Sequence, residues 1–91
     1  MSQVVVYSRP GCHLCEEALG GILSLREEGY RFDLHEVDIE SEELLFKRLL
    51  ERIPVVEVDG RVVSELVLDE AALRARLDNV VSDDRAGGRG A

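Results

Sequence analysis

Residues 4–15 of this protein, VVVYSRPGCHLC, decide its fold. Residues 4–7 form a short run of valine and tyrosine, and such β-branched and aromatic runs are typical of a buried strand. The next four residues include a proline and a glycine, which favour a turn. From Cys12 to Gly29, apolar residues recur at spacings near three and four, and this period predicts an amphipathic helix. The stretch therefore predicts a strand, a turn and a helix that begins at two cysteines.

Two adjacent glycines, Gly20 and Gly21, lie inside the predicted helix. They cost the helix about 1–2 kcal/mol relative to two alanines, because glycine loses more backbone entropy on folding. Either a close packing contact or a local kink would account for them, and both interpretations stay open.

Two further elements are predicted in the middle of the chain. Residues 31–38 alternate between apolar and polar side chains, which indicates a half-buried strand. Ser41 follows this strand, and we expect it to cap a second helix by accepting a hydrogen bond from a free backbone N–H. The apolar face of that helix is formed by Leu45, Leu49 and Ile53.

The rest of the chain contains a hairpin and a last helix. Asp59-Gly60 lies between two valine-rich runs, which is typical of a two-residue hairpin turn, and Asp69 is expected to cap the last helix. The predicted order is β-α-β-α-β-β-α, and the strands of its first β-α-β unit must be parallel. This order predicts an α/β fold, with a four-stranded mixed sheet covered by three helices. We expect one domain over residues 1–78 and a disordered tail over residues 79–91.

The composition limits the classes of partner. The chain has 91 residues, of which 45% are hydrophobic and 33% are charged, values that are ordinary for one globular domain. Its 19 acidic and 11 basic residues give a formal net charge of −8, whereas phosphate binding relies on clustered Lys and Arg. No apolar stretch approaches the roughly 20 residues of a membrane span, and no secretory signal is recognised. We therefore expect a cytoplasmic monomer with neither nucleic acid nor membrane as a partner.

The two cysteines indicate redox or metal chemistry, because cytosolic proteins keep their thiols reduced and rarely use structural disulfides. We expect Cys12 at or near the N-cap, where free N–H groups and the helix dipole stabilise a thiolate. Arg9 and His13 are expected to add positive charge and so to lower the pKa of the Cys12 thiol. Cys15 lies one helical turn further on, where it can attack a mixed disulfide on Cys12. Leu14 is expected to cover Cys15, which makes Cys12 the exposed nucleophile.

Two alternatives to a redox enzyme stay open. A closed zinc site needs four ligands, and the Cys and His residues of the chain are Cys12, His13, Cys15 and His35. Their spacing predicts no metal site within one chain, but a metal or iron–sulfur cluster could be held between two chains through Cys12. The cysteine pair could also report redox state in an interaction protein, without turnover.

Over residues 3–77, the chain resembles the small, atypical glutaredoxin-like branch of the thioredoxin superfamily. The resemblance rests on residues 7–15 (YSRPGCHLC), on residues 53–56 (IPVV) and on the Asp59-Gly60 turn. It implies a thioredoxin-like fold of the glutaredoxin type and dithiol–disulfide oxidoreductase activity. The implied partners are disulfide-bearing proteins, with a reductase enzyme or glutathione as the electron donor.

The same resemblance assigns roles to the residues around Pro54. It implies that the Ile53–Pro54 peptide bond is cis and faces the cysteine pair. It also implies that the backbone of Ile53 pairs with a bound peptide or glutathione. From the residues alone, a proline that separates a helix end from the start of a strand is sufficient to explain Pro54.

The chain departs from the glutaredoxin pattern at two places. His13 stands where glutaredoxins usually have proline or glycine. Residues 63–67 (VSELV) stand where they have two glycines followed by an acid, which receive glutathione. Because Glu65 would crowd and repel the carboxylates of glutathione, we expect weak or absent glutathione binding and no required cofactor.

Overall fold

The computed structural model describes residues 2–78, so the predicted tail over residues 79–91 lies outside the described residues. The elements follow the predicted order, with one short 3₁₀ helix added between the second strand and the second helix. They are β1 (Ser2–Ser8), α1 (His13–Glu27), β2 (Phe32–Asp38), η1 (Ile39–Ser41), α2 (Glu43–Leu49), β3 (Val55–Val58), β4 (Arg61–Glu65) and a helical segment over residues 70–78.

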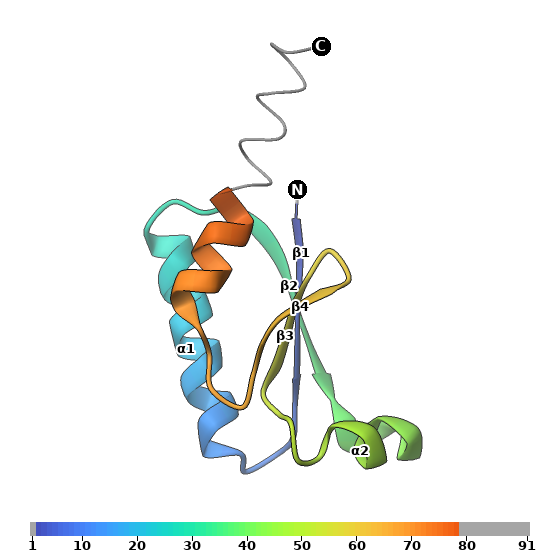
Figure 1. The fold of residues 1–91 in the computed structure, drawn as a ribbon. Coiled ribbons are helices and arrows are strands. Elements are labelled where there is room, and N and C mark those ends of the chain that lie inside the picture. The colour runs from blue at the N-terminus through green and yellow to red at the C-terminus, as the bar shows by residue number, and fades with distance from the viewer. Residues whose placement is uncertain (1, 79–91) are drawn as a thin grey trace.

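The four strands form one mixed sheet in the order β2-β1-β3-β4. β1 runs parallel to β2 and antiparallel to β3, and β3 runs antiparallel to β4. Figure 1 shows α1 and the helix over residues 70–78 together on one side of the sheet, with α2 near one end of the sheet on the other side. The predicted fold class, a four-stranded mixed sheet covered by three helices, is confirmed.

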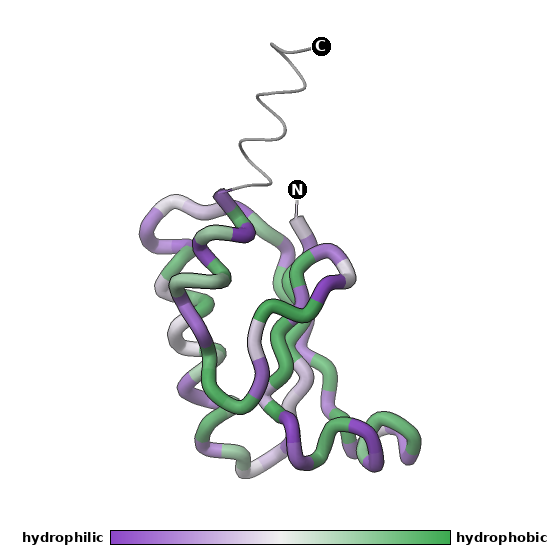
Figure 2. The backbone as a smooth tube through the Cα atoms, viewed as in Figure 1, coloured by the Kyte–Doolittle hydropathy of each residue, from purple (hydrophilic) through white to green (hydrophobic). Residues whose placement is uncertain are grey.

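Two hydrophobic clusters hold these layers together, and Figure 2 shows that hydrophobic residues recur along both the strands and the helices. We call the larger one the main core; it lies between the sheet and the two helices on its first side. The smaller one, the site cluster, lies at the end of the sheet where α1 begins. The main core contains Val4, Val6, Ile22, Leu25, Phe32, Val56, Val58, Leu73 and Leu77. The site cluster contains Cys15, Ile39, Ile53 and Val55.

A close packing contact accounts for one glycine of the pair inside α1. A Cβ atom added at Gly21 would lie 2.6 Å from Cδ2 of Leu68 and 3.3 Å from Oε2 of Glu70. A Cβ atom added at Gly20 would have no such neighbour within 4 Å. Gly21 therefore lets the segment after β4 pack closely against α1.

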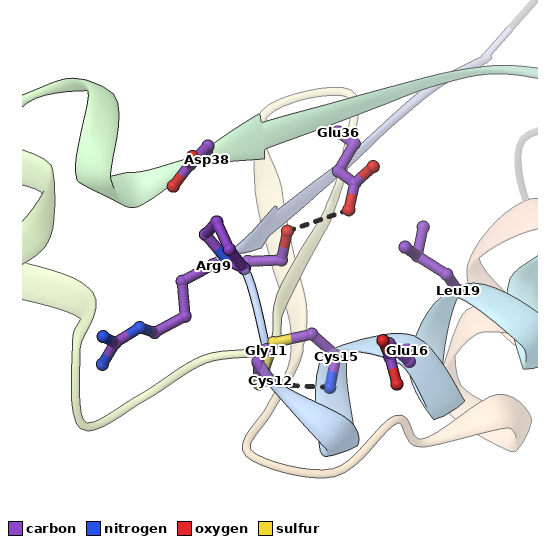
Figure 3. A pocket seen from close by; sticks show the side chains of 10 residues that line it. Arg9, Gly11, Cys12, Cys15, Glu16, Leu19, Glu36 and Asp38 are labelled. Carbon is purple, nitrogen blue, oxygen red and sulfur yellow. Dashed lines mark hydrogen bonds between the residues drawn. A yellow bond between two sulfur atoms is a disulfide. The ribbon is translucent and has the colours of Figure 1, made fainter.

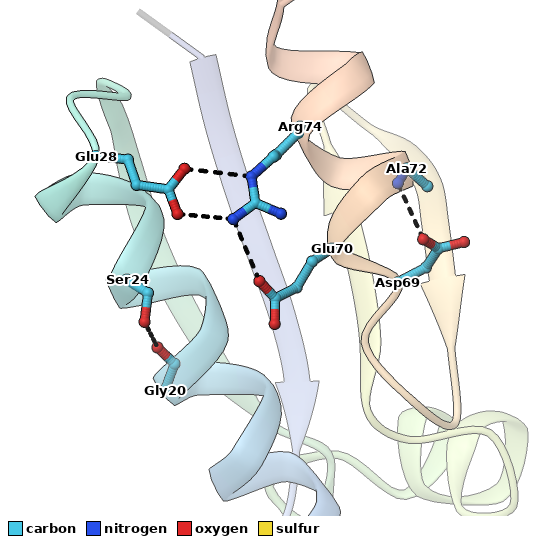
Figure 4. Close-up of polar contacts among 7 residues, drawn as sticks. All are labelled: Gly20, Ser24, Glu28, Asp69, Glu70, Ala72 and Arg74. Atoms are coloured by element: carbon cyan, nitrogen blue, oxygen red, sulfur yellow. Dashed lines mark hydrogen bonds and ion pairs between the residues drawn. The ribbon is translucent and has the colours of Figure 1, made fainter.

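Polar contacts then fix the helix over residues 70–78 beside α1 (Figure 4). The guanidinium of Arg74 donates to both oxygens of Glu28, at 2.7 and 3.2 Å, and lies 3.5 Å from Glu70. The backbone N–H of Ala72 donates to Oδ1 of Asp69 at 3.0 Å, which confirms the predicted cap.

The predicted hairpin turn is also confirmed. Val58 pairs with Arg61, so two residues, Asp59 and Gly60, form the turn. Both have positive φ, +51° and +87° respectively, as a two-residue turn of this kind requires. Gln3 on β1 holds the turn, since its N–H donates to Oδ1 of Asp59 at 2.9 Å.

The prediction that Ser41 caps the second helix is wrong. Ser41 ends the 3₁₀ helix, and α2 begins at Glu43 with Glu42 at its N-cap and no side-chain capping bond. Asp38 provides a cap one element earlier, because its Oδ1 accepts from the N–H of Glu40 at 2.8 Å. The hydroxyl of Ser41 donates back to the carbonyl of Asp38 at 2.7 Å and is thus engaged in the 3₁₀ turn.

The second helix is also shorter than predicted. It ends at Leu49, so Ile53 lies outside it, and the N–H of Ile53 donates to the carbonyl of Leu49 at 3.0 Å. A residue before proline is disfavoured in the helical conformation, which explains why the helix does not continue to Ile53. Within residues 2–78, none of the helices has the length and hydrophobicity that a membrane span requires.

Candidate active site at the start of helix α1

Cys12 is the N-cap residue of α1, as its position after the Pro-Gly turn predicts. Gly11 has a φ of +77°, which turns the chain into the helix. Sγ of Cys12 accepts a hydrogen bond from the N–H of Cys15 at 3.3 Å. The Cys12 sulfur therefore lies at the positive end of the helix, where negative charge is stabilised.

The structure describes the oxidised form of this pair. Cys12 and Cys15 are joined by a disulfide, with their Cα atoms 5.2 Å apart. The two sulfurs differ in access, because Cys15 is only 2% exposed whereas Cys12 is partly exposed. A partner approaching from solvent therefore meets Cys12 first.

The prediction that Leu14 covers Cys15 is wrong. Leu14 is 46% exposed, and Cys15 is buried instead among Ile39, Ile53 and Val55 of the site cluster. Adjacent residues of a helix point in different directions. Leu14 consequently points away from the sheet into solvent, whereas Cys15 points from α1 into the site cluster.

A hollow of about 310 Å³ opens beside the disulfide. Figure 3 shows the carboxylates of Glu16, Glu36 and Asp38 around it. The buried hydroxyl of Ser8 donates to Oε2 of Glu36 at 3.0 Å. The residues that line the hollow are Ser8, Arg9, Pro10, Gly11, Cys12, Cys15, Glu16, Leu19, Glu36 and Asp38.

Sequence reasoning missed Ser8, Glu36 and Asp38 as neighbours of the disulfide. Ser8 pairs in register with Asp38, since β1 and β2 are parallel and end together. The ends of two adjacent parallel strands lie at one edge of the sheet, and that rule could have brought these residues together. The carboxylates of Glu36 and Asp38 make the surroundings of the disulfide acidic.

Arg9 and His13 take carboxylate partners rather than the Cys12 sulfur. A guanidinium nitrogen of Arg9 lies 2.9 Å from Glu40, and Figure 3 shows this side chain directed away from the disulfide. The ring of His13 is largely exposed and lies 3.9 Å from Glu16 and 3.5 Å from Glu17. The expected effect of Arg9 and His13 on the Cys12 thiol stays a prediction, whereas the N-cap position itself places the positive end of the helix at Cys12.

Arg9 is held by a second contact that the sequence pattern did not indicate. Its guanidinium lies 5.6 Å from the centre of the Phe46 ring on α2, a distance typical of a cation–π contact. Arg9 therefore links the turn before Cys12 to α2 and η1.

The Ile53–Pro54 peptide bond is cis, as the resemblance implies. Both residues are buried, and Ile53 shares a second hollow with Cys12. That hollow is lined by Arg9, Pro10, Gly11, Cys12, Leu50 and Ile53. The fold thus brings the predicted site residues Cys12, Cys15 and Ile53 together, although about 40 positions separate them in sequence, and Pro54 follows Ile53 directly.

Glu65 does not face the site in the way that the sequence interpretation assumed. Its two oxygens accept from Arg52, at 2.6 and 3.3 Å. It lines a different hollow, with Tyr7, Arg48 and Val62 among its neighbours. The charge of Glu65 is therefore balanced by Arg52, which weakens the basis for expecting Glu65 to repel glutathione.

Tyr7 lies in the same hollow as Glu65. Its hydroxyl donates to Oε1 of Glu57 at 3.3 Å. Burial raises the pKa of Tyr7 above its ordinary value, and the nearby negative charge of Glu57 raises it further, while Arg48 opposes the shift. The hydroxyl of Tyr7 is thus engaged with β3 and not with the disulfide.

The cysteine pair has no further metal ligands beside it among residues 2–78. This part of the chain contains no group of three or more His, Cys, Asp or Glu side chains arranged to hold a metal ion. His35 lies on β2, where its Nε2 is 2.6 Å from Oε1 of Gln3. The four Cys and His residues of the chain therefore do not meet in one place.

Comparisons with known proteins agree with this fold. The sequence matches the family described as Glutaredoxin-like domain (DUF836) over residues 3–78. It is 30% identical over 80 residues to the glutaredoxin-like protein YDR286C homolog of Dictyostelium discoideum, covering 82% of this chain and 74% of that protein.

Solved structures give the same result. Protein Ne2328 from Nitrosomonas europaea superposes with a TM-score of 0.72 at 30% identity, covering 82% of this chain and 89% of that one. Oxidised thioredoxin from Plasmodium falciparum superposes with a TM-score of 0.57 at 14% identity, covering 87% of this chain and 80% of that one, and so shares the fold. The predicted thioredoxin-type fold is confirmed, and the chain belongs to the glutaredoxin-like domain family of the thioredoxin superfamily.

Proposed function

We propose that this protein is a dithiol–disulfide oxidoreductase that reduces disulfides in protein partners. The observation that carries the proposal is the unequal access of the two sulfurs at the start of α1. Cys12 is partly exposed at the helix N-terminus, whereas Cys15 is buried one turn further on. An exposed, stabilised thiolate beside a buried second thiol is the arrangement that two-step thiol exchange needs.

In the first step, the thiolate of Cys12 attacks one sulfur of a client disulfide. A bond forms between Cys12 and that sulfur, and the other client sulfur leaves as a thiolate that takes a proton from water. In the second step, the thiol of Cys15 loses its proton and attacks the Cys12 sulfur. The second client thiolate leaves, so two electrons have passed to the client and Cys12 and Cys15 form the disulfide of this structure.

The Ile53–Pro54 segment is proposed to orient the client chain beside Cys12. The N–H of Ile53 already donates to the carbonyl of Leu49. We therefore expect the carbonyl oxygen of Ile53 to accept a hydrogen bond from the client backbone. A single backbone contact of this kind positions the client without demanding a particular side chain.

Glutathione is proposed to bind weakly, for a different reason from the one that the sequence suggested. The loop after β4 carries the side chains of Leu66 and Val67, which are 51% and 65% exposed, where close approach needs glycines. Carboxylates of Glu17 and Glu70 flank this loop, and like charge disfavours the carboxylates of glutathione. We therefore propose that a reductase enzyme, and not glutathione, reduces the Cys12–Cys15 disulfide after each reaction. The proposed setting is a reducing compartment such as the cytoplasm, with a role in redox homeostasis.

Reduction of insulin disulfides, with dithiothreitol as the electron source, tests the proposal. The wild type is expected to accelerate the reaction over dithiothreitol alone, and Cys12→Ser is expected to abolish the acceleration. Reduced Cys15→Ser, mixed with insulin after dithiothreitol has been removed, should retain the first step and accumulate a mixed disulfide with insulin, visible as an added mass.

Two outcomes would contradict the proposed function. One is a rate equal to that of dithiothreitol alone, and the other is activity that survives in a folded Cys12→Ser protein. If protein purified without oxygen carries a Cys12-bound metal with visible absorption, the two-chain metal module is favoured instead.

A further inference from the structure

One further pocket, near the start of α1, has no role in the reaction described above. It is a hollow of about 210 Å³ between the first turns of α1 and the loop after β4, which we call the side pocket. Its apolar wall includes Leu14 and Val67, whose side chains are 46% and 65% exposed. The side pocket is lined by Leu14, Glu17, Ala18, Val67, Leu68 and Glu70.

The loop that forms one wall of the side pocket is held in place. The N–H of Leu66 donates to the carbonyls of both Arg52 and Pro54 at 3.0 Å. The N–H of Val67 donates to the carbonyl of Glu65 at 2.7 Å, and Leu68 packs against Gly21. A wall fixed at both ends loses little entropy when a ligand binds.

The rim of the side pocket is acidic. Glu17 lies 3.5 Å from the ring of His13, and Glu70 lies 3.5 Å from Arg74. Arg74 is engaged more closely by Glu28, at 2.7 Å. In a chain of net charge −8, this rim favours a cationic group beside an aliphatic one.

We propose that the side pocket selects client segments in which an aliphatic residue is followed by Lys or Arg. This inference rests on the proposed function. Leu14 lies two positions after Cys12 at the start of α1, and helical geometry places their Cα atoms about 5–6 Å apart, a span that about two residues of an extended client chain cover. The aliphatic side chain therefore enters the side pocket from about two residues away from the reacting client cysteine. Glutathione has no aliphatic residue at that distance, so the side pocket separates protein clients from glutathione.

Short peptides whose single cysteine is linked to a coloured aromatic thiol test this inference. Cys12 attack releases the aromatic thiolate, and stopped-flow absorbance gives its second-order rate constant. One peptide carries leucine and lysine at the second and third positions from its cysteine, and its partner carries serine and glutamate there. Each pair is made with the residues on either side of the cysteine, because the direction of the client chain is part of the question.

The wild type is expected to react about tenfold faster with the leucine–lysine peptide in one of the two directions, because one aliphatic side chain becomes buried. Val67→Ser should reduce this ratio to about one. The double variant Glu17→Gln, Glu70→Gln should reduce it about two- to threefold, since exposed ion pairs are weak. Val62→Ser and Leu23→Ser remove comparably exposed apolar side chains outside the pocket and should keep the ratio.

A ratio near one for the wild type in both directions overturns the inference, as does an unchanged ratio in Val67→Ser. An aromatic disulfide that carries no peptide reports separately whether Cys12 reacts. If Cys12 reacts with this disulfide while the peptide ratio is one, the proposed selection of clients by the side pocket is wrong and the proposed function stands. If reduced wild-type protein fails to react with it at all, both are overturned.

Discussion

The main core and the site cluster contain neighbouring residues of the same strand but differ in size and in composition. Along β3, Val55 belongs to the site cluster, whereas Val56 and Val58 belong to the main core. The main core is closed by two helices and contains only apolar residues. The site cluster is smaller, is covered on one side by the seven-residue α2, and includes Cys15. Most of the buried apolar side chains therefore lie away from the sulfur that changes its bonding in the proposed reaction.

The largest expected effect is on the main core. Leu25→Ala removes a fully buried side chain and should lower the free energy of unfolding by about 3 kcal/mol. Urea denaturation of the oxidised protein measures the loss. Leu23→Ala, at an exposed position of the same helix, is the control and should cost far less. Equal losses in the two variants would contradict the assignment of the main core.

The same experiment on the site cluster should give a smaller loss and a second effect. Ile53→Ala is expected to lower the free energy of unfolding by about 2 kcal/mol, at the low end for such substitutions, because Ile53 is 7% exposed whereas Leu25 is fully buried. It should also uncover Cys15, which iodoacetamide would then alkylate faster in the reduced protein. Leu25→Ala should leave that alkylation rate unchanged while the protein is folded. If both variants changed the rate alike, the separation of the two clusters would be lost.

The contact between α1 and the loop after β4 joins the main core to the side pocket, because Leu68 packs against the main core and lines the side pocket. Gly21→Ala gains helix propensity, but its Cβ would lie 2.6 Å from Cδ2 of Leu68, so the end of that side chain has to move. Gly20→Ala meets no atom and should stabilise the protein by about 0.5–1 kcal/mol. Gly21→Ala should therefore unfold at a lower temperature than Gly20→Ala, and equal unfolding temperatures of the two variants would argue against a close contact at Gly21.

The smallest effect concerns the ion pair at the far end of the main core. Hydrogen bonding from Arg74 lowers the pKa of Glu28 below its ordinary value of 4.5. A carboxyl whose pKa is lowered by folding stabilises the protein above the pKa of the unfolded state, and this contribution is lost as the pH falls through the folded pKa.

The wild type should thus be more stable than Arg74→Gln at neutral pH, and the difference should shrink below about pH 4.5. Denaturation of both proteins at several pH values measures it. A difference that stayed constant with pH would rule out ionisation of Glu28 as its source.

Local patterns in the sequence determined most of the elements of this protein. The apolar period of α1, the Asp59-Gly60 turn and the cap at Asp69 each depend on residues close together in the chain. Cys12 was placed at the start of α1 for the same reason, because the Pro-Gly turn and the helical period both lie beside it. The predicted order of elements follows from these short-range features. So does the expectation that Cys12 attacks first and Cys15 second, which stays a prediction.

Only the tertiary structure decided which side chains meet around the disulfide. Arg9 found Glu40 and Phe46, and Glu65 found Arg52, because these partners come from other elements. Gly21 was explained only by Leu68, which lies on a loop 47 positions later. Ionic and packing contacts act over a few ångströms in space, whatever the separation in sequence. The sequence by itself therefore determined where the reactive cysteines begin a helix, and the folded chain decided what surrounds them.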